Sequence, residues 1–237
     1  YPVFQNRYNK AVVRLKKALK NNELGHSRII SVRVRWCRPQ RYYNLSDWRG
    51  TFSHDGGALT NQGIHHIDLI RYLFGNVKSL KANMKTLGAR IEVEDTVIAN
   101  LIFENNTLGV LEITTAARPI DYEASISAVC EKGLAQLGGL AVNELQIFTP
   151  KPKDCKIYSE KIPDAYGFGH YHLYKDIALD FNKIKKFPVS YNDCLNTIKL
   201  LNAFYVSSEK NKSVVVKNIN DSKRLGIKNE KISKKYR

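Results

Sequence analysis

Alternating apolar and polar positions predict a β-strand near the start of the chain, from Arg28 to Trp36. Ile30, Val32 and Val34 share one face of this segment with Trp36, and the intervening positions are polar or charged. Successive side chains of a strand point to opposite faces, so this pattern is typical of a strand with one buried and one wet face.

Further runs of β-favouring residues follow in the middle of the chain. They cover residues 77–85, 95–103, 107–115, 122–130, 133–137 and 144–148. Turn-forming residues at 104–107 and 131–133 separate neighbouring runs and indicate hairpins. We therefore predict a meander of four to six antiparallel strands, with a short strand at Val214–Val216 added near the end.

Helical spacing of apolar residues marks three other segments. One covers residues 11–19, a second runs from about His170 to Lys185, and a third runs from Asn192 or Asp193 to Glu209 with Ser190 or Asn192 as its cap. The second helix is expected to turn inward Leu173, Ile177, Ala178, Phe181 and Ile184. Beyond about Ile219 the signals for packing fade.

Together these elements predict an α+β fold, a large and mostly antiparallel open sheet with helices on one face. No predicted strand is followed by a GxGxxG or GxxxxGK[ST] motif, so the sequence contains no recognisable phosphate-cradling nucleotide fold. If the open face of the sheet is apolar, it is expected to be covered by a partner subunit.

One stretch, from Gly56 to Gly75, combines a helical pattern with candidate chemistry. A glycine pair opens it, apolar residues follow at helical spacing, and Phe74-Gly75 ends it, which predicts one helix. Asn61 and His65 then lie one turn apart on a common face. The simpler interpretation makes His65 and His66 ordinary helix residues, one in the core and one in solvent.

Two segments rich in aromatic and basic residues are predicted to be loops. Residues 37–55 contain Arg38, Arg41, Trp48 and Arg49, which suit flat or anionic groups, although the aromatic side chains could simply pin the loop. Residues 166–172 carry two glycines around Phe168 and then two histidines, a pattern typical of a turn before a helix.

Composition narrows the class of protein. The 237 residues contain no apolar run of the length that crosses a bilayer and no targeting segment, which favours a cytoplasmic protein. Cys37, Cys130, Cys155 and Cys194 are far apart and form no metal-ligand pattern, so we expect reduced, structural cysteines and no metal site. The chain opens on Tyr1-Pro2-Val3-Phe4, and we interpret it as a fragment.

The formal charge of +16 raises the possibility of nucleic-acid binding. Much of the excess lies at the C-terminus, and no helix shows the basic, aromatic-interleaved stripe that binds single strands. A solvated tail, or attraction of anionic ligands, is therefore favoured over nucleic-acid binding.

The stretch Gly56–Asp68 resembles the substrate-domain signature of the glucose–fructose oxidoreductase / inositol dehydrogenase (Gfo/Idh/MocA) family. Trp48-Arg49-Gly50 and the ending Ala203–Ser208 with Ser213–Val216 also match the family pattern, so the resemblance spans about residues 1–217. It implies a substrate-binding and oligomerisation domain of the dihydrodipicolinate-reductase-like C-terminal type, followed by a basic C-terminal tail at 218–237.

Within the family, Phe4–Asn9, Thr60–Gly63 and Tyr166–His170 are most similar to bacterial nucleotide-sugar enzymes. These oxidise C3 of UDP-N-acetylglucosaminuronic acid with NAD during synthesis of surface polysaccharide, the O-antigen of lipopolysaccharide, and form homotetramers. The family's Rossmann domain, with its glycine-rich site and Glu-Lys-Pro lysine, has no counterpart in this sequence. The isolated chain is therefore expected to be inactive.

The resemblance also implies roles for single residues. His65 takes the position of the acid/base, and Asn61 stands where many relatives have an aspartate, so it can orient a group but cannot stabilise an imidazolium by charge. Trp48 and Arg49 would lie near the nicotinamide or its ribose. The implied substrate-binding residues are Arg7, Arg41, Asn61, Asp68, Gly169 and His170.

Three interpretations remain open at this stage. The first is the substrate domain of an NAD-dependent nucleotide-sugar dehydrogenase, and the second is a non-catalytic, oligomeric module that binds sugar nucleotides. The third is a basic nucleic-acid-binding domain. For Asp68 the simpler alternative is a carboxylate on the helix surface, and His66 is expected to point away from the site.

Overall fold

A mixed sheet of eight strands is the scaffold of the protein, in a computed structural model that describes residues 1–235. The strands are β1 (Ser27–Arg35), β2 (Val77–Lys85), β3 (Thr96–Phe103), β4 (Leu108–Thr114), β5 (Glu123–Cys130), β6 (Leu134–Gly138), β7 (Glu144–Phe148) and β8 (Val214–Val215). Their order across the sheet is β7-β6-β5-β1-β4-β3-β2-β8. All strands fall within the predicted segments, to within a residue or two at each end.

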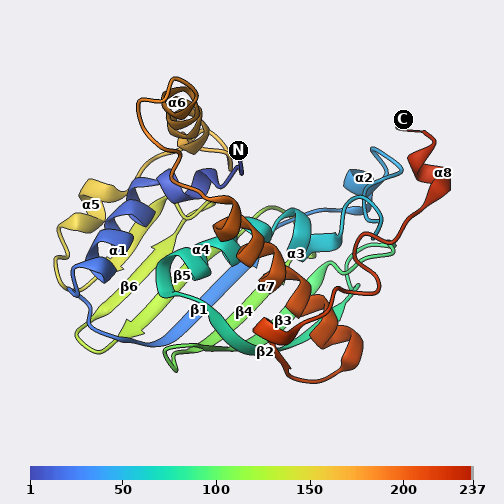
Figure 1. The fold of residues 1–237 in the computed structure, drawn as a ribbon, viewed down its shortest axis with the longest axis horizontal. Helices are drawn as coiled ribbons and strands as arrows, with labels where there is room; N and C mark the ends of the chain where they lie inside the picture. The colour runs from blue at the N-terminus through green and yellow to red at the C-terminus, as the bar shows by residue number, and fades with distance from the viewer. Residues whose placement is uncertain (236–237) are drawn as a thin grey trace.

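Two antiparallel halves, β2–β3–β4 and β5–β6–β7, are joined by β1 at the centre of the sheet (Figure 1). Strand β1 pairs parallel with β4, with Val32 opposite Leu111, and antiparallel with β5, with Val32 opposite Ile126. The predicted α+β class and mostly antiparallel sheet are confirmed, but the single continuous meander is wrong. The strand pattern does not determine which distant strand enters between β4 and β5.

Helices cover one face of this sheet (Figure 1). The helical elements of residues 1–235 are η1 (Gln5–Tyr8), α1 (Lys10–Lys20), α2 (Gln40–Tyr43), α3 (Gly57–Asn61), α4 (Ile64–Phe74), α5 (Asp154–Tyr158), α6 (Gly169–Phe181), α7 (Tyr191–Lys210), η2 (Val216–Asn218) and α8 (Glu230–Ser233). Of these, α6 and α8 project away from the sheet. Helix α1 matches its prediction. The predicted cap of α7 is also found, since the hydroxyl of Ser190 accepts a hydrogen bond from the backbone N–H of Asp193, with 3.1 Å between the two heavy atoms.

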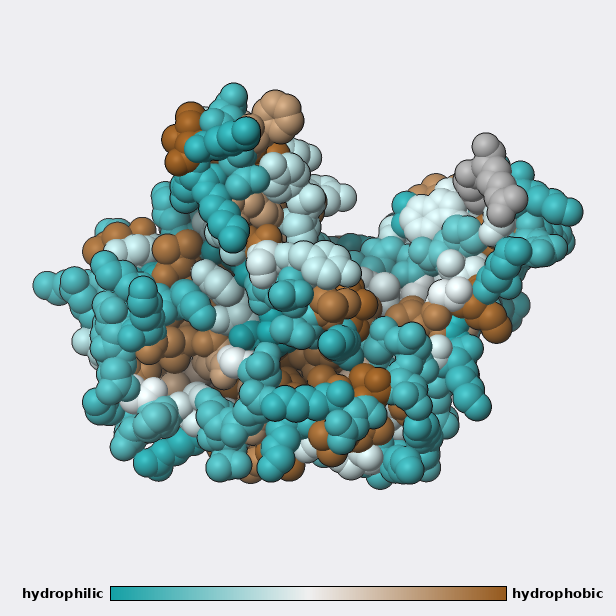
Figure 2. Space-filling view, in the orientation of Figure 1, coloured by the Kyte–Doolittle hydropathy of each residue, from teal (hydrophilic) through white to brown (hydrophobic). Residues whose placement is uncertain are grey.

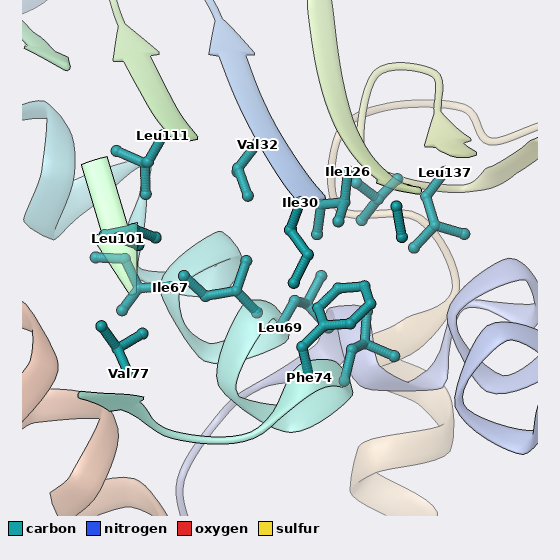
Figure 3. Close-up of a cluster of buried hydrophobic side chains, with 14 of the residues drawn as sticks. Ile30, Val32, Ile67, Leu69, Phe74, Val77, Leu101, Leu111, Ile126 and Leu137 are labelled. Atoms are coloured by element: carbon teal, nitrogen blue, oxygen red, sulfur yellow. The ribbon is translucent and has the colours of Figure 1, made fainter. Parts of the chain in front are cut away.

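The core lies between α4 and the centre of the sheet. Ile67 and Leu69 of α4 point toward Ile30 and Val32 of β1, with Phe74 at the end of the same helix (Figure 3). Burying one such aliphatic side chain contributes about 1.5–3 kcal/mol, so this contact fixes α4 firmly on the sheet. Residues at the start of α4 are thereby held in a defined place.

The predicted helix over residues 56–74 is two helices, α3 and α4, separated at Gln62-Gly63. The sequence interpretation is therefore wrong about its continuity. The chain is crowded at the break, since a Cβ at Gly63 would lie 2.6 Å from Cδ1 of Ile113 and 2.8 Å from the carbonyl O of Leu59. Apolar spacing continues across the break and hides it.

Helix α6 stands away from the body of the molecule and packs on η1 (Figure 1). Leu173 is fully buried and Ile177 half-buried, as predicted, but Ala178 is exposed. Phe181 is 79% exposed and Ile184, beyond the end of the helix, is 71% exposed. Their predicted inward orientation is wrong, because the sheet does not extend beneath this helix.

The C-terminal segment packs on the domain through the last described residues. Leu225 lies against the core, Ile232 is buried, and the backbone N of Gly226 donates to the carbonyl O of Phe52 at 2.8 Å. Lys235 forms an ion pair with Asp47. Leu225 and Ile232 thus pack on the domain, while most other residues from 220 to 235 are exposed, and the rest of the expected basic tail lies outside the described residues.

The upper outline of the molecule is hollowed between two projections (Figure 2). Helix α6 forms one projection, the C-terminal segment with α8 forms the other, and α3 lies between them (Figure 1). Within residues 1–235, no helix is both long and apolar enough to span a membrane, and no cluster of acidic, histidine or cysteine side chains is suited to hold a metal ion. All four cysteines are free thiols.

Candidate active site

His65, the second residue of α4, is half-buried beside η1 and α6. Its ring meets that of Phe4 edge to face, with centroids 6.4 Å apart, and its buried Nδ1 has no hydrogen-bond partner among residues 1–235. Burial first, and then the nearby charge of His170, lower the pKa of His65 to about 4. The imidazole is therefore neutral at pH 7 and able to accept a proton.

Asn61, the last residue of α3, is oriented by a carboxylate. Its amide Nδ2 donates to Oδ1 of Asp55, and its Oδ1 accepts a hydrogen bond of 3.0 Å from the side chain of Gln62. The second oxygen of Asp55 accepts the backbone N–H of Gly50 at 2.6 Å. In the described part of the chain no hydrogen bond joins Asn61 to His65, so each is held by its own helix.

Arg7 and Asp68 lie together, but inside the protein. Nε of Arg7 donates to Oδ2 of Asp68 at 2.7 Å, and Nη2 donates to Oδ1 at 2.5 Å. The side chains are 7% and 1% exposed. Asp193 binds the remaining Nη1 of Arg7 at 2.7 Å, and the hydroxyl of Thr197 donates to Asp68 at 3.2 Å. Asp68 is thus not a surface carboxylate, and this ion pair joins η1, α4 and α7.

Trp48 and Arg49 form a second group, in the loop between α2 and α3. The guanidinium of Arg49 lies 4.4 Å from the ring centroid of Tyr42 and 4.5 Å from that of Trp48. Its Nη1 donates to the hydroxyl of Tyr42 at 2.6 Å, while its buried Nε has no partner in the part of the chain that the structure describes. Arg41, on α2 nearby, is exposed to solvent.

Gly169 and His170 begin α6 and bring it against η1. A Cβ at Gly169 would lie 2.3 Å from the carbonyl O of Gln5, so this close approach requires glycine. His170 lies near Tyr166 and Tyr174, at ring distances of 5.9 and 6.5 Å, and its charge acts on His65 of the same chain. The structure therefore brings His65 and His170 to one place.

A basic cavity of about 550 Å³ lies on the other side of α6, against α1. Its lining includes Lys10, Lys175 and Lys185, together with the rings of Tyr8 and His172, which stack at 6.5 Å and 13°. Two of the lysines are paired, Lys10 with Glu160 at 3.4 Å and Lys185 with Asp176 at 2.9 Å.

Sequence reasoning missed two carboxylates near this site. Asp55 was recognised only as part of a polar loop, and Glu94, just before β3, was not singled out. Both are buried, with 6% and 5% of their surface exposed. The signal that could have found Asp55 is its place directly before the glycine pair, at a helix start. Glu94 had no such signal, because it meets α3 only through the fold.

The chain is similar to a known protein family and to known structures. A sequence model described as the GFO/IDH/MocA C-terminal domain matches residues 12–136. A search among curated proteins found no match. Among solved structures, the chain is similar to the WlbA dehydrogenase from Bordetella pertussis in complex with NADH and UDP-GlcNAcA, at 34% identity over 90% of this chain and with a TM-score of 0.85.

The WlbA dehydrogenase from Chromobacterium violaceum, also in complex with NADH and UDP-GlcNAcA, is 35% identical over 90% of this chain, with a TM-score of 0.81. A levoglucosan dehydrogenase in complex with NADH and levoglucosan, at 21% identity, 92% coverage and a TM-score of 0.77, shares the fold. This chain covers 63%, 61% and 66% of the three neighbours, respectively.

Proposed function

The chain belongs to the GFO/IDH/MocA family, and from this premise we propose that it is the substrate-binding and oligomerisation domain of an NAD-dependent sugar dehydrogenase. Its substrate is a nucleotide sugar of the UDP-N-acetylglucosaminuronic acid type, oxidised at the C3 hydroxyl.

One observation carries this proposal. Over 90% of its length the chain is 34% identical to a WlbA dehydrogenase whose structure holds NADH and UDP-GlcNAcA. The neighbours below 25% identity support the fold alone and do not bear on the choice of sugar.

His65 supplies the proton chemistry in this proposal. Oxidation of a secondary alcohol removes a hydride from carbon and a proton from the hydroxyl oxygen, and a neutral imidazole can accept that proton. The unpartnered Nδ1 and the lowered pKa of His65 both support a neutral ring before substrate binds. An anionic sugar beside it would raise this pKa toward the working pH, since an opposite charge favours the imidazolium.

The groups around Trp48 fit a nicotinamide nucleotide. Arg49 is held between two aromatic rings. Its buried Nε–H has no partner among the described residues and could donate a hydrogen bond to a ribose or phosphate oxygen. When bound, the nicotinamide ring supplies the hydride acceptor. The role of this chain is to orient the sugar hydroxyl and to take up its proton.

The positive charge of the chain suits a substrate with a diphosphate and a carboxylate. Arg41 is free to solvent beside the Trp48–Arg49 group, and Lys175 lines the basic cavity along α6. We propose that such cations attract the anionic substrate. Attraction of an anionic substrate is thus an alternative to nucleic-acid binding as an explanation of the net positive charge.

We expect most contacts to the dinucleotide to be made by residues outside this sequence, because the GxGxxG motif does not occur in it. The isolated 237 residues should then bind the sugar nucleotide without turning it over. A second copy of the domain is proposed to cover the open face of the sheet.

Thermal unfolding of the isolated chain tests binding. Millimolar UDP-N-acetylglucosaminuronic acid should raise the unfolding midpoint, because a ligand that binds only the native state stabilises it by mass action. UDP-N-acetylglucosamine, which lacks the carboxylate, and a double-stranded oligonucleotide serve as matched controls. A larger shift with the oligonucleotide than with the sugar acid would contradict the proposal.

Turnover is tested with the complete polypeptide that the gene encodes, by following NADH formation with the same sugar acid. Binding without NADH formation would favour the non-catalytic module. NADH formation from UDP-N-acetylglucosamine at an equal rate would show that the proposed substrate is wrong.

A further inference from the structure

Segments that are distant in the sequence meet at the buried carboxyl group of Glu94. Glu94 precedes β3, and its Oε1 accepts the backbone N–H of Leu59 in α3 at 3.0 Å. The hydroxyl of Tyr205, in α7, lies 2.9 Å from the same oxygen. This hydroxyl also forms a hydrogen bond with the carbonyl O of Gly56 and lies 2.8 Å from the hydroxyl of Thr60. Glu94 and Tyr205 therefore hold both sides of the turn that enters α3.

The glycine pair before α3 is shaped to this carboxyl group. Gly56 and Gly57 have φ angles of +76° and +86°, in the region that favours glycine. A Cβ at Gly57 would lie 2.3 Å from both carboxyl oxygens of Glu94. The turn and the carboxyl group thus occupy complementary space, and neither can change without the other.

Hydrogen counting indicates which protonation state the cluster holds. The phenol of Tyr205 has one proton but faces two acceptors, the carbonyl O of Gly56 and Oε1 of Glu94. A protonated Glu94 resolves this conflict, because it can donate to the phenol oxygen while the phenol donates to Gly56. Burial raises the pKa of Glu94 to about 8, which keeps that proton in place at neutral pH.

The turn is connected to His65 through backbone contacts. The N–H of Ala58 donates to the carbonyl O of Glu94 at 3.0 Å, and the N–H of Gly63 donates to the carbonyl O of Ala58 at 2.8 Å. Gly63 directly precedes α4, in which His65 is the second residue. A shift of the Gly56–Gly57 turn is therefore passed to the start of α4.

We propose that Glu94 and Tyr205 are positioning residues that act through the Gly56–Gly57 turn to hold His65 where proton transfer requires it. This inference rests on the proposed dehydrogenase function. It assigns a task to the glycine pair and to the Ala203–Ser208 segment, which the proposed function leaves without one.

The surroundings of Glu94 determine how the cluster responds to pH. Glu94 and Tyr205 line a cavity of about 210 Å³ between β2, α7 and the C-terminal segment. The charged groups that face Glu94 from the surrounding elements are Asp55, Lys85, Glu92, Glu209 and Arg224. Above about pH 8 an ionised Glu94 would again present two acceptors to one phenol proton, and the turn should loosen.

The test uses the complete polypeptide and the variants Tyr205→Phe and Glu94→Gln. Tyr43→Phe is the matched control, since Tyr43 is also buried and, within residues 1–235, its hydroxyl bonds only Thr115, at 3.0 Å. NADH formation from the sugar acid is measured between pH 6 and 9.5, and the His65 Hε1 resonance is followed by NMR as a readout that needs no turnover.

Tyr205→Phe should lower kcat by about tenfold or more with little change in KM, because a small misplacement of a catalytic group has that effect. It should also shift the His65 resonance, while Tyr43→Phe changes neither. Wild-type kcat should fall above about pH 8, whereas Glu94→Gln, which cannot ionise, should show no such fall.

Equal kcat values and an unshifted His65 resonance in Tyr205→Phe would overturn the inference. An alkaline fall that persists in Glu94→Gln would also overturn it, and this variant decides the matter if Tyr205→Phe does not fold. If the wild type forms no NADH, the proposed function fails, and the NMR comparison alone decides whether the cluster positions His65.

Discussion

Two adjacent histidines show how burial separates roles at the scale of single residues. His66 is fully buried beside Trp36, and burial lowers its pKa to about 3. His65 is half-buried, beside Phe4 and near His170. The sequence shows two histidines in a row, and the expectation that His66 points elsewhere is confirmed by the fold.

Replacing His65 should remove activity without removing structure. In the complete polypeptide, His65→Gln is expected to lower kcat by about 10²-fold or more, the usual contribution of a general base. Its urea midpoint should stay close to that of the wild type, since Nδ1 of His65 makes no hydrogen bond to any described residue. His26→Gln, at an exposed histidine, is the control, and equal loss in both variants would contradict the assignment.

The same variant should change how stability depends on pH. The pKa of His65 is about 4 in the folded protein and about 6.5 when unfolded, so the unfolded state binds more protons between these values. The free energy of unfolding keeps the contribution of the neutral His65 above pH 6.5. As the pH falls below this value, the contribution is lost by at most about 1.4 kcal/mol per pH unit. Urea unfolding at pH 7 and pH 5 should show a smaller loss for His65→Gln than for the wild type.

The pair of Arg7 and Asp68 carries a different prediction. Arg7→Met leaves the carboxylate of Asp68 buried without its cation, which is expected to destabilise the fold by about 3–5 kcal/mol. The double variant Arg7→Met/Asp68→Leu should recover part of this loss, because it removes both charges. A single variant with unchanged urea midpoint would show that the pair is not buried in solution.

At the scale of elements, the sequence predicted every strand of the described residues and three helices but missed the break between α3 and α4. Periodicity reports which face is buried, and that face stays the same across Gln62-Gly63. At the break Gly63 lies against Ile113 of β4, which approaches it only when the sheet has formed. The exposed face of α6 was missed for a related reason, since periodicity does not reveal what lies beneath a helix.

Gly57 offers a direct test of the turn before α3. Gly57→Ala introduces a Cβ at φ +86° and 2.3 Å from the Glu94 oxygens, whereas Gly75→Ala introduces one at φ +94° with nothing within 4 Å. Backbone strain of about 1–3 kcal/mol applies to each, and only Gly57→Ala adds a clash with Glu94. We expect Gly57→Ala to be the less stable variant by urea unfolding. Equal midpoints would contradict the close packing of the turn.

At the scale of the whole molecule, the sheet has two different faces. One is covered by helices, and the other exposes apolar side chains from neighbouring strands: Ile29, Ile98, Ile102, Leu108, Val110 and Val129. The sequence predicted that an open face exists, because alternation in the strands is visible in it. Which strands adjoin one another, and hence how continuous this apolar area is, followed only from the mixed topology.

This continuity leads to a prediction about assembly. Ile102 is 43% exposed and pairs with Leu108, 56% exposed, so a lysine there would place a charge inside any interface on this face. Light scattering after size exclusion should show an oligomer for the wild type and a smaller species for Ile102→Lys, because an unpaired buried charge strongly disfavours association. Val13→Lys, on α1 and 48% exposed, is the control and should leave the mass unchanged. A monomeric wild type, or an oligomer that tolerates Ile102→Lys, would show that this face is not the interface, and the exposed aromatic residues of α6 would then be the next surface to test.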